Sequence, residues 1–134
     1  MLKEKDKATP MSNGTGVVFG FERLDVWRKA ADFAGDIYAI TKSFPREELF
    51  GLTMQLRRAG VSIAANIAEG ASRASGKDQA RFFGIAFGSL NEVATMLYIA
   101  QGQGFIRDDQ SAQMRSEIAG IGRMLSGLKR SAKR

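Results

Sequence analysis

Residues 55–70 read QLRRAGVSIAANIAEG, and the pattern in this stretch decides how the whole chain folds. A helix turns by about 100° per residue, which brings the polar side chains of the stretch onto one narrow line. That line consists of Gln55, Arg58, Ser62, Asn66 and Glu69. Most of the residues beside it are small or apolar. The line is therefore either a solvent-exposed face or a polar seam packed against another helix.

A matching line in a later segment favours the seam. Gly84, Gly88, Ser89, Glu92 and Thr95 share one face of a predicted helix. Glu92 is the only acidic residue in the middle of that helix, and small residues on both lines permit close approach. We therefore predict a buried ion pair between Arg58 and Glu92, with hydroxyl and amide groups completing the hydrogen bonds. The structural polar seam predicted here comprises Gln55, Arg58, Ser62, Asn66, Glu69, Ser89 and Glu92.

The predicted seam has an energetic consequence. Removing one partner of a buried ion pair costs about 3–5 kcal/mol because the other charge is left stranded. An exposed pair contributes only about 0–1 kcal/mol. We therefore expect Arg58→Ala or Glu92→Ala to destabilise the fold severely, whereas Arg57→Ala should not. The seam is expected to specify helix register and not to carry out chemistry.

The chain is helical in pattern throughout its length after the first twenty residues. Residues 1–20 mix charges with proline and glycine without any period, which predicts a disordered leader. Residues 21–134 are predicted to be an all-α, antiparallel up-down four-helix bundle, because long periodic segments follow one another with short links. The predicted helices cover about 22–43, 45–72, 76–101 and 108–130.

Local signals mark the ends of these helices and the core side of the last one. Pro45 suits the first position of a helix, and Ser75 or Gly76 is expected to cap the third. Asp108 is expected to cap the fourth helix. Apolar residues in that helix repeat at the 4-3-4-3 spacing of a bundle seam, namely Met114, Ile118, Ile121, Leu125 and Leu128.

The first predicted helix has more apolar surface than one neighbour would cover. Its apolar stripes span about half of its circumference, wider than the single stripe of a helix with one packed face. This excess predicts self-association. The residues expected to contact other copies of the chain are Val26, Phe33, Ile37 and Ile40.

Composition excludes several classes of active site. The chain has no cysteine and no histidine, so disulfides, thiolate chemistry and the commonest general base and metal ligand are absent. Glu69 and Glu92 are the only acidic candidates for a metal site inside the bundle. We expect no catalytic residue, no metal and no cofactor.

The sequence also bears on where the protein resides. The N-terminal residues are charged and do not resemble a secretory signal. The most apolar segment, 82–100, contains Asn91 and Glu92 near its middle, and a charge at mid-bilayer costs about 3 kcal/mol. A buried helix of a soluble, cytoplasmic protein is expected, with no membrane partner.

The positive charge gathers at the C-terminal end. The net charge is +6, and residues 105–134 contribute four of these six charges. A basic end on an otherwise balanced domain indicates a polyanionic partner, although a solvated, frayed terminus would read the same way. The candidate residues for electrostatic nucleic-acid binding are Arg115, Arg123, Lys129, Arg130, Lys133 and Arg134.

Three segments carry a resemblance to a known family: LDVWRKA (24–30), FPREELFGLTMQLRRAGVSIAANIAEGASR (44–73) and FFGIAFGSLNEVATMLYIAQ (82–101). They resemble the four-helix-bundle proteins first noticed as reading frames within intervening sequences of bacterial 23S ribosomal RNA genes. The likeness covers about residues 21–130. Its signature polar positions correspond here to Arg58, Ser62, Asn66, Glu69, Gly70, Ser89 and Glu92.

This resemblance implies a small cytoplasmic all-α protein that forms a ring-like homo-oligomer, commonly a pentamer. It also implies kinship with the accessory variability determinant of diversity-generating retroelements, a basic pentameric barrel that binds nucleic acid and a reverse transcriptase. The resemblance brings no catalytic assignment for the signature residues.

The sequence is consistent with two functions. The first is a homo-oligomeric binding module whose basic tails hold RNA or DNA by phosphate contacts, with weak sequence specificity. The second is an interaction scaffold that docks a protein partner, for example a reverse transcriptase, without a direct nucleic-acid role. An enzyme is disfavoured by composition.

Overall fold

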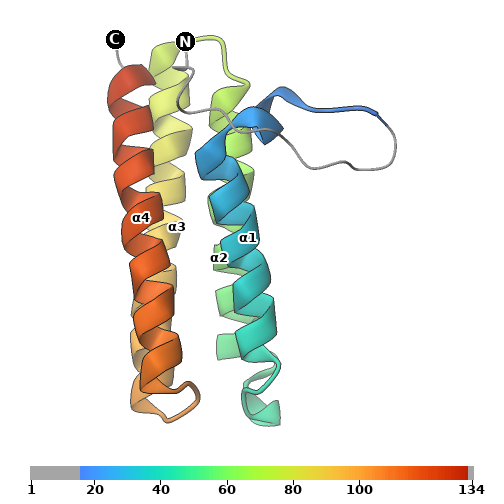
Figure 1. Cartoon of the computed structure of the whole chain (residues 1–134), viewed down its shortest axis with the longest axis vertical. Helices are drawn as coiled ribbons and strands as arrows, with labels where there is room; N and C mark the ends of the chain where they lie inside the picture. Colours follow the sequence, from blue (N-terminus) through green and yellow to red (C-terminus); the bar gives the residue numbers. More distant parts are fainter. Residues whose placement is uncertain (1–15, 133–134) are drawn as a thin grey trace.

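The computed structural model describes residues 16–132, which form four α-helices and no β-strand. The helices are α1 (Asp25–Thr41), α2 (Leu52–Ala71), α3 (Gly76–Gly102) and α4 (Asp108–Ala132). They run alternately up and down, so the α2–α3 turn and the end of α4 lie at the same end of the bundle (Figure 1). The all-α, four-helix architecture predicted from the sequence is confirmed for these residues.

The helix predicted over 45–72 is interrupted near its start. Arg46–Glu48 form a short 3-10 helix, and α2 begins only at Leu52. Gly51 lies between them with a non-helical backbone (φ −111°, ψ −112°). The Glu48 carboxylate accepts the backbone N–H of Leu52 at 3.3 Å. That side chain thereby satisfies one of the donors that the start of a helix leaves free.

The predicted caps are partly confirmed. The Ser75 hydroxyl accepts the backbone N–H of Asp78 at 3.1 Å and caps α3 as expected. Asp108 is not the cap of α4 but lies in its first turn. The backbone N–H of Arg107, just before the helix, donates to the Gln110 side-chain oxygen at 3.0 Å.

The N-terminal part differs from the prediction where it can be compared. Of the predicted leader 1–20, residues 1–15 lie outside the described residues. A 3-10 helix, Gly20–Arg23, then precedes α1, and the extended residue Leu24 separates the two. Phe21 packs against Trp27 of α1, with 5.0 Å between the ring centroids. This contact places Phe21, the first residue after the predicted leader, against the bundle.

The predicted oligomer contacts on α1 are wrong. Val26, Phe33, Ile37 and Ile40 are all buried inside the single chain. The reason is the close approach of α2, where Gly60 has no side chain and leaves its space to Ile37. The stripe of α1 that carries these four residues is therefore covered within the subunit, whereas Tyr38 of the same helix stays exposed.

The core side of α4 follows its predicted seam. Met114, Ile121, Leu125 and Leu128 are buried, and Ile118 is half-buried. The most extensive packing in the bundle is between α2 and α3, the helices that carry the two polar lines.

Candidate functional site

The centre of the predicted polar line does lie between α2 and α3. The Ser62 and Ser89 hydroxyls form a hydrogen bond of 2.9 Å across the two helices. The Asn66 amide donates to the Ser62 hydroxyl at 3.0 Å and to its carbonyl oxygen at 2.8 Å. Ser89 is buried. These three side chains fix the register of α2 against α3.

The predicted ion pair between Arg58 and Glu92 is wrong for the single chain. Both side chains are exposed, and neither has a hydrogen-bond or ion-pair partner among the described residues. Ser62 and Ser89 lie between α2 and α3, where their hydroxyls bond, whereas Arg58 and Glu92, about one turn away on each helix, are exposed. The severe loss of stability expected for Arg58→Ala in the subunit therefore has no structural basis.

The outer members of the predicted seam also face solvent. Gln55 and Glu69 are exposed. Glu69 binds Arg73, one turn further along, with 2.8 Å between the carboxylate and guanidinium. The seam thus reduces to Ser62, Asn66 and Ser89, and the rest of the line borders a surface.

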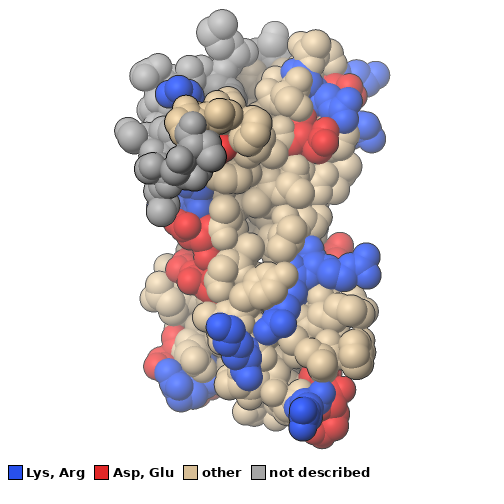
Figure 2. All heavy atoms as spheres, turned by 90° about the vertical axis from the view of Figure 1, so that its right-hand side faces the viewer, with Lys and Arg blue, Asp and Glu red and all other residues tan. Residues whose placement is uncertain are grey.

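Beside this line, α2 borders an apolar groove that the sequence analysis did not predict. The groove has a volume of about 700 Å³. Its most exposed member is Phe50, with 82% of its surface accessible. Figure 2 shows this face, formed by α1 and α2, where uncharged side chains cover much of the surface between groups of Lys and Arg. The lining residues are Tyr38, Leu49, Phe50, Thr53, Met54, Arg57, Arg58, Val61, Ser62 and Ala65.

The signal for this groove was present in the sequence. Met54, Val61 and Ala65 recur on one stripe of α2, outside its buried stripe, and Phe50 continues the spacing in the turn just before the helix. Periodicity alone does not tell which of two apolar stripes the fold buries. The fold buries the stripe of Leu56, Ile63 and Ile67 and leaves the other exposed.

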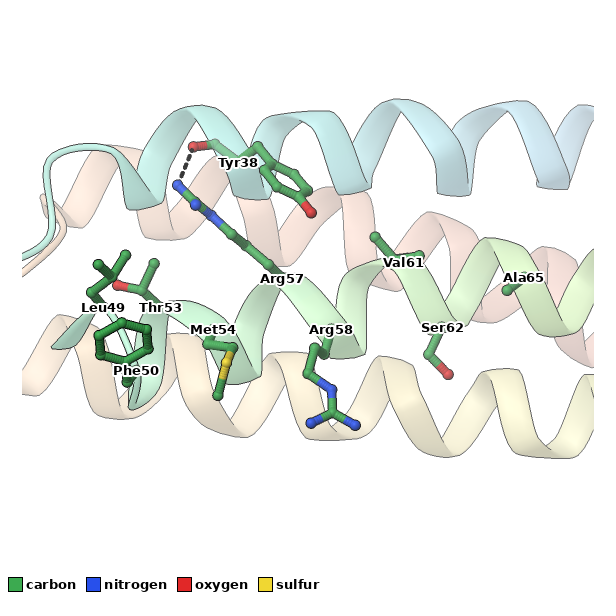
Figure 3. A pocket seen from close by; sticks show the side chains of 10 residues that line it. All are labelled: Tyr38, Leu49, Phe50, Thr53, Met54, Arg57, Arg58, Val61, Ser62 and Ala65. Carbon is green, nitrogen blue, oxygen red and sulfur yellow. Dashed lines mark hydrogen bonds between the residues drawn. The ribbon is translucent and has the colours of Figure 1, made fainter.

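The two arginines of the groove have different environments. Arg57 reaches α1, where its Nε donates to the Thr41 hydroxyl at 2.9 Å and its guanidinium lies 4.7 Å from the Tyr38 ring centroid. Arg58 points to the opposite side of α2 and is unpaired (Figure 3). Arg57 is therefore the arginine that links two helices, the reverse of the prediction.

The basic residues predicted for nucleic-acid binding lie along the outer side of α4. Arg115, Arg123 and Arg130 are exposed, and Lys129 is half-buried. Lys129 reaches α3, where its ammonium lies 3.3 Å from the position a Cβ would take on Gly84. Lys133 and Arg134 lie outside the described residues. The sequence has no acidic residue after Glu117 to balance this segment.

The α2–α3 turn adds cations at the end where α4 finishes. Arg73 and Arg81 both place their guanidinium carbons 4.6 Å from the Phe82 ring centroid. Lys77 is exposed beside them. We call this region the basic end, defined by Arg73, Lys77, Arg81, Lys129 and Arg130. Its acidic neighbours Glu69 and Asp78 pair with Arg73 and Arg81.

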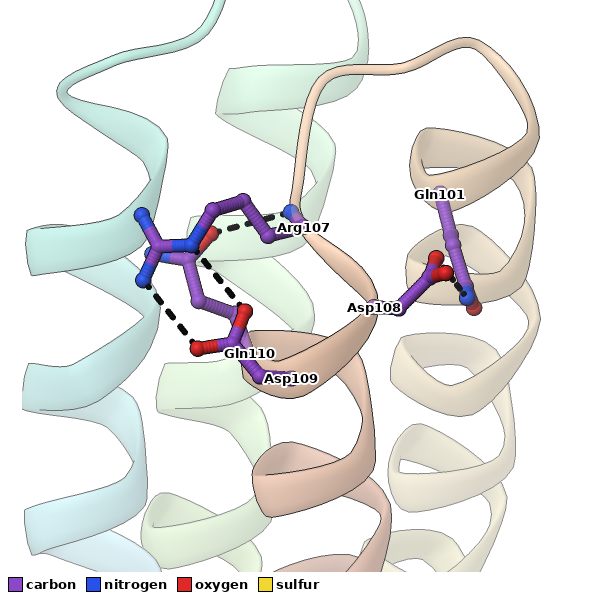
Figure 4. Close-up of polar contacts among 5 residues, drawn as sticks. All are labelled: Gln101, Arg107, Asp108, Asp109 and Gln110. Atoms are coloured by element: carbon purple, nitrogen blue, oxygen red, sulfur yellow. Dashed lines mark hydrogen bonds and ion pairs between the residues drawn. The ribbon is translucent and has the colours of Figure 1, made fainter.

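The opposite end of the bundle is balanced by acidic residues. Arg107 donates from its Nε to the Asp109 carboxylate at 3.0 Å, and Gln101 donates to Asp108 at 2.9 Å (Figure 4). The hydrogen bond from Arg107 lowers the pKa of Asp109. Glu47 and Glu48 lie at this end as well. The bundle therefore carries its excess positive charge at the end where α4 finishes.

The helices that carry these surfaces match a known family. The sequence profile of the family described as 23S rRNA-intervening sequence protein matches residues 22–127. The chain belongs to this family. The match begins just before α1 and reaches the last turns of α4, so it spans the whole bundle.

A solved structure is similar to this 23S rRNA-intervening sequence protein. It is a protein of unknown function from the S23 ribosomal protein family of Bacteroides thetaiotaomicron. The two are 26% identical, the likeness covers 78% of this chain and 95% of the other, and the TM-score is 0.73. Among curated proteins, none matches the chain. The likeness supports the four-helix fold and assigns no activity.

Metal ligands and membrane-spanning helices are two further features that bear on the chemistry of this family member. Within residues 16–132, no group of three or more Asp or Glu side chains is arranged to hold a metal ion. By length and composition one helix in this range, α3, is apolar enough to cross a membrane, a property it shares with core helices of soluble bundles. Neither observation points to a reaction.

Acidic residues also meet between α1 and α4 of this intervening sequence protein. Lys29, Asp32 and Asp36 of α1 line a pocket of about 360 Å³ together with Glu117 of α4. The Oε2 atom of Glu117 is buried without a hydrogen-bond partner. Burial raises the pKa of Glu117, and the negative charges of Asp36 and Asp32 raise it further, while Gln113 acts in the opposite direction.

This pocket should make stability depend on pH. In the folded chain the pKa of Glu117 is higher than its ordinary value of 4.5, so the folded chain holds this proton more tightly than the unfolded chain does. Stability from this group is therefore present at acid pH and is lost as pH rises from 4.5 through the folded-state pKa. Glu117→Gln should remove this dependence, so that the variant gains stability relative to the unsubstituted chain as pH rises.

Urea unfolding at a series of pH values measures the effect. Glu47→Gln, an exposed position at the end of the bundle, is the matched control and should track the unsubstituted chain. If the difference between Glu117→Gln and the unsubstituted chain does not change with pH, the carboxyl is not held in a proton-binding environment.

Proposed function

We propose that this 23S rRNA-intervening sequence protein is a non-enzymatic, cytoplasmic homo-oligomer that binds RNA or DNA through phosphate contacts. The observation that carries the proposal is the separation of charge along the bundle. Cations of α4 and of the α2–α3 turn gather at the basic end, whereas acidic residues balance those at the other end. Phosphates bind such a surface without any element that reads bases.

Assembly would multiply this charge. In a ring whose subunits are related by rotation about an axis parallel to the helices, every basic end lies on the same rim. A ring of about five copies, as the resemblance implies, would present a continuous cationic rim to a polyanion. Exposed Arg123 and Arg130 extend that rim along α4.

Binding of a labelled RNA, followed by fluorescence anisotropy at two salt concentrations, tests the proposal. If about four phosphates are neutralised on a duplex, affinity should fall about 100-fold between 50 and 200 mM salt, because log K falls by about 0.9 per phosphate with log salt. Arg123→Ala with Arg130→Ala should lower affinity about tenfold or more at the lower salt. Lys42→Ala with Arg46→Ala, at the opposite end, is the control and should have little effect. Equal affinity at both salt concentrations would contradict the proposal.

The protein scaffold is the alternative function. The apolar groove beside α2 favours it, because an exposed apolar patch on a soluble domain commonly marks a protein contact. Kinship with the accessory variability determinant would make a reverse transcriptase the partner to test. Removing residues 129–134 deletes four cations but keeps Leu128, the last buried core residue. Nucleic-acid affinity should collapse in the truncated chain, whereas a purely protein-binding scaffold would keep its partner.

A further inference from the structure

Between Leu24 and Ala132, the exposed large apolar side chains are confined to two regions, and Val17, Val18 and Phe19 are exposed just before the bundle. One is the apolar groove beside α2, where Phe50, Met54 and Val61 are exposed. The other is the outer side of α3, where Ile85, Tyr98 and Ile99 are exposed. The described part of α4 exposes no large apolar side chain. Isolated soluble chains rarely leave such surfaces uncovered.

The outer side of α3 has the spacing of a helix-packing face. Ile85, Gly88, Glu92, Thr95 and Ile99 follow one another at intervals of three and four residues, which places them on one line. A Cβ on Gly88 would have nothing within 4 Å, so the subunit's own fold does not require glycine there. Glycine inside a helix costs about 1 kcal/mol relative to alanine. In the most apolar 18-residue stretch of α3, only a third is buried inside the bundle.

The charges of these two surfaces are complementary. The groove is lined by two arginines and no acidic residue, and Arg58 is unpaired. The line on α3 carries one acidic residue, Glu92, which is also unpaired. Arg58 lies among the apolar side chains of the groove, and Glu92 lies on α3 between the small residue Gly88 and Thr95. Burying either one against a second molecule requires an opposite charge in that molecule.

The two surfaces are also in register along the bundle. The bond between Ser62 and Ser89 fixes which residues of α2 and α3 lie at the same height. Arg58 comes four residues before Ser62, and Glu92 three residues after Ser89. Because α2 and α3 are antiparallel and rise about 1.5 Å per residue, Arg58 and Glu92 lie within about 2 Å of the same height. By the same count, Met54 lies within about 3 Å of the height of Ile99, and Val61 within about 3 Å of that of Gly88.

We infer that neighbouring copies of this chain meet through the apolar groove beside α2 in one copy and the outer side of α3 in the next, with Arg58 of one copy paired with Glu92 of its neighbour. Rotation about an axis parallel to the helices keeps every residue at its own height, so only side chains at equal heights meet across such an interface. The equal heights of Arg58 and Glu92 fulfil that condition. The inference rests on the homo-oligomer of the proposed function but not on nucleic-acid binding.

Charge exchange between chains tests the pairing. R58E and E92R are purified separately, without nucleic acid, and examined by sedimentation velocity at micromolar concentration. Each variant alone places like charges together at the interface, so self-association should weaken about 100-fold or more and the chain should sediment as a smaller species. The chain with both substitutions, R58E/E92R, places opposite charges at every interface whatever the number of subunits, so it should assemble again. An equimolar mixture of the two single variants should recover assembly in part, because unlike chains meet with opposite charges while a ring with an odd number of subunits keeps one junction between like chains. An ion pair within one chain could not produce this recovery in the mixture.

Controls separate the interface from general effects of charge. K42E reverses an exposed cation of the α1 end outside both surfaces, and it should assemble like the unsubstituted chain. Circular dichroism should show that R58E and E92R remain helical, since neither side chain contributes to the core. Val61→Asp and Ile99→Asp should also prevent assembly, whereas Ala112→Asp on the exposed side of α4 should not.

Three results would overturn the inference. They are an unsubstituted chain that stays monomeric, charge-reversed chains that assemble as well as the unsubstituted one, and a double variant R58E/E92R that fails to assemble. Recruitment of the unsubstituted monomer to neutral lipid vesicles would identify a membrane in place of a second copy as the cover for α3. Nucleic-acid binding is measured in a separate experiment, so loss of that activity with intact assembly would contradict only the proposed function.

Discussion

Replacing Phe33 by alanine should lower the free energy of unfolding by about 3–5 kcal/mol, because the truncation leaves a cavity inside a packed core. Phe33 of α1 is only 1% exposed in the single chain. The surrounding core includes Ile37 of α1 and Ile121 of α4. Urea unfolding followed by circular dichroism measures the loss.

The same residue type offers a matched control. Phe50 is 82% exposed, and Phe50→Ala should change the stability of the isolated subunit by less than about 0.5 kcal/mol. The comparison also tests whether Phe33 of α1 belongs to the core of the subunit or to a contact between copies. If Phe33 contacted other copies, Phe33→Ala would reduce the size of the assembly while leaving the subunit stable. That outcome would contradict the observed core.

Replacing Gly70 by alanine should also destabilise the bundle, by about 1–3 kcal/mol. A Cβ at this position would lie 2.6 Å from Cε1 and 2.8 Å from Cδ1 of Phe83. It would also lie 3.1 Å from the Gln79 carbonyl oxygen. The Phe83 ring is buried and the carbonyl belongs to the α3 backbone, so neither can yield without moving the helix. This crowding should outweigh the gain of about 1 kcal/mol in helix propensity.

Gly35 of α1 provides the control for propensity. A Cβ there would have nothing within 4 Å, so Gly35→Ala should raise the free energy of unfolding by about 0.5–1 kcal/mol. Thermal unfolding of Gly70→Ala and Gly35→Ala measures the expected loss of stability in the first and the expected gain in the second. Equal stabilisation by the two substitutions would show that α2 and α3 do not approach as closely at Gly70 as the structure has it.

Much of the fold was predictable because its signals are local. The 3.6-residue period that defines α3 and the seam of α4 depends only on residues within a few turns of one another. Ser75 was predictable as a cap because a hydroxyl at that position satisfies free donors of the next turn. The break at Gly51 was missed, since the residues around it continue the helical pattern.

The candidate surfaces were less predictable. The polar line of α2 was read as one buried unit, but the structure buries its Ser62–Asn66 part and exposes Arg58. The apolar groove was missed because α2 has two apolar stripes. Which of the two stripes becomes buried depends on how the other helices pack against α2. The basic residues of α4 were found from the sequence, while their neighbours Arg73 and Arg81 joined them only through the antiparallel topology.

The sequence by itself determined the helices, the apolar stripe of α4, the excess of positive charge near the C-terminus and the absence of histidine and cysteine chemistry. Each of these follows from residue type and short-range spacing. The tertiary structure alone decided that Phe33 belongs to the core and that Arg58 and Glu92 face outward. Those outcomes depend on how closely helices far apart in the sequence approach. Between α2 and α3 the hydroxyls of Ser62 and Ser89 meet, whereas the charged side chains of Arg58 and Glu92 lie on the exposed surface beside them.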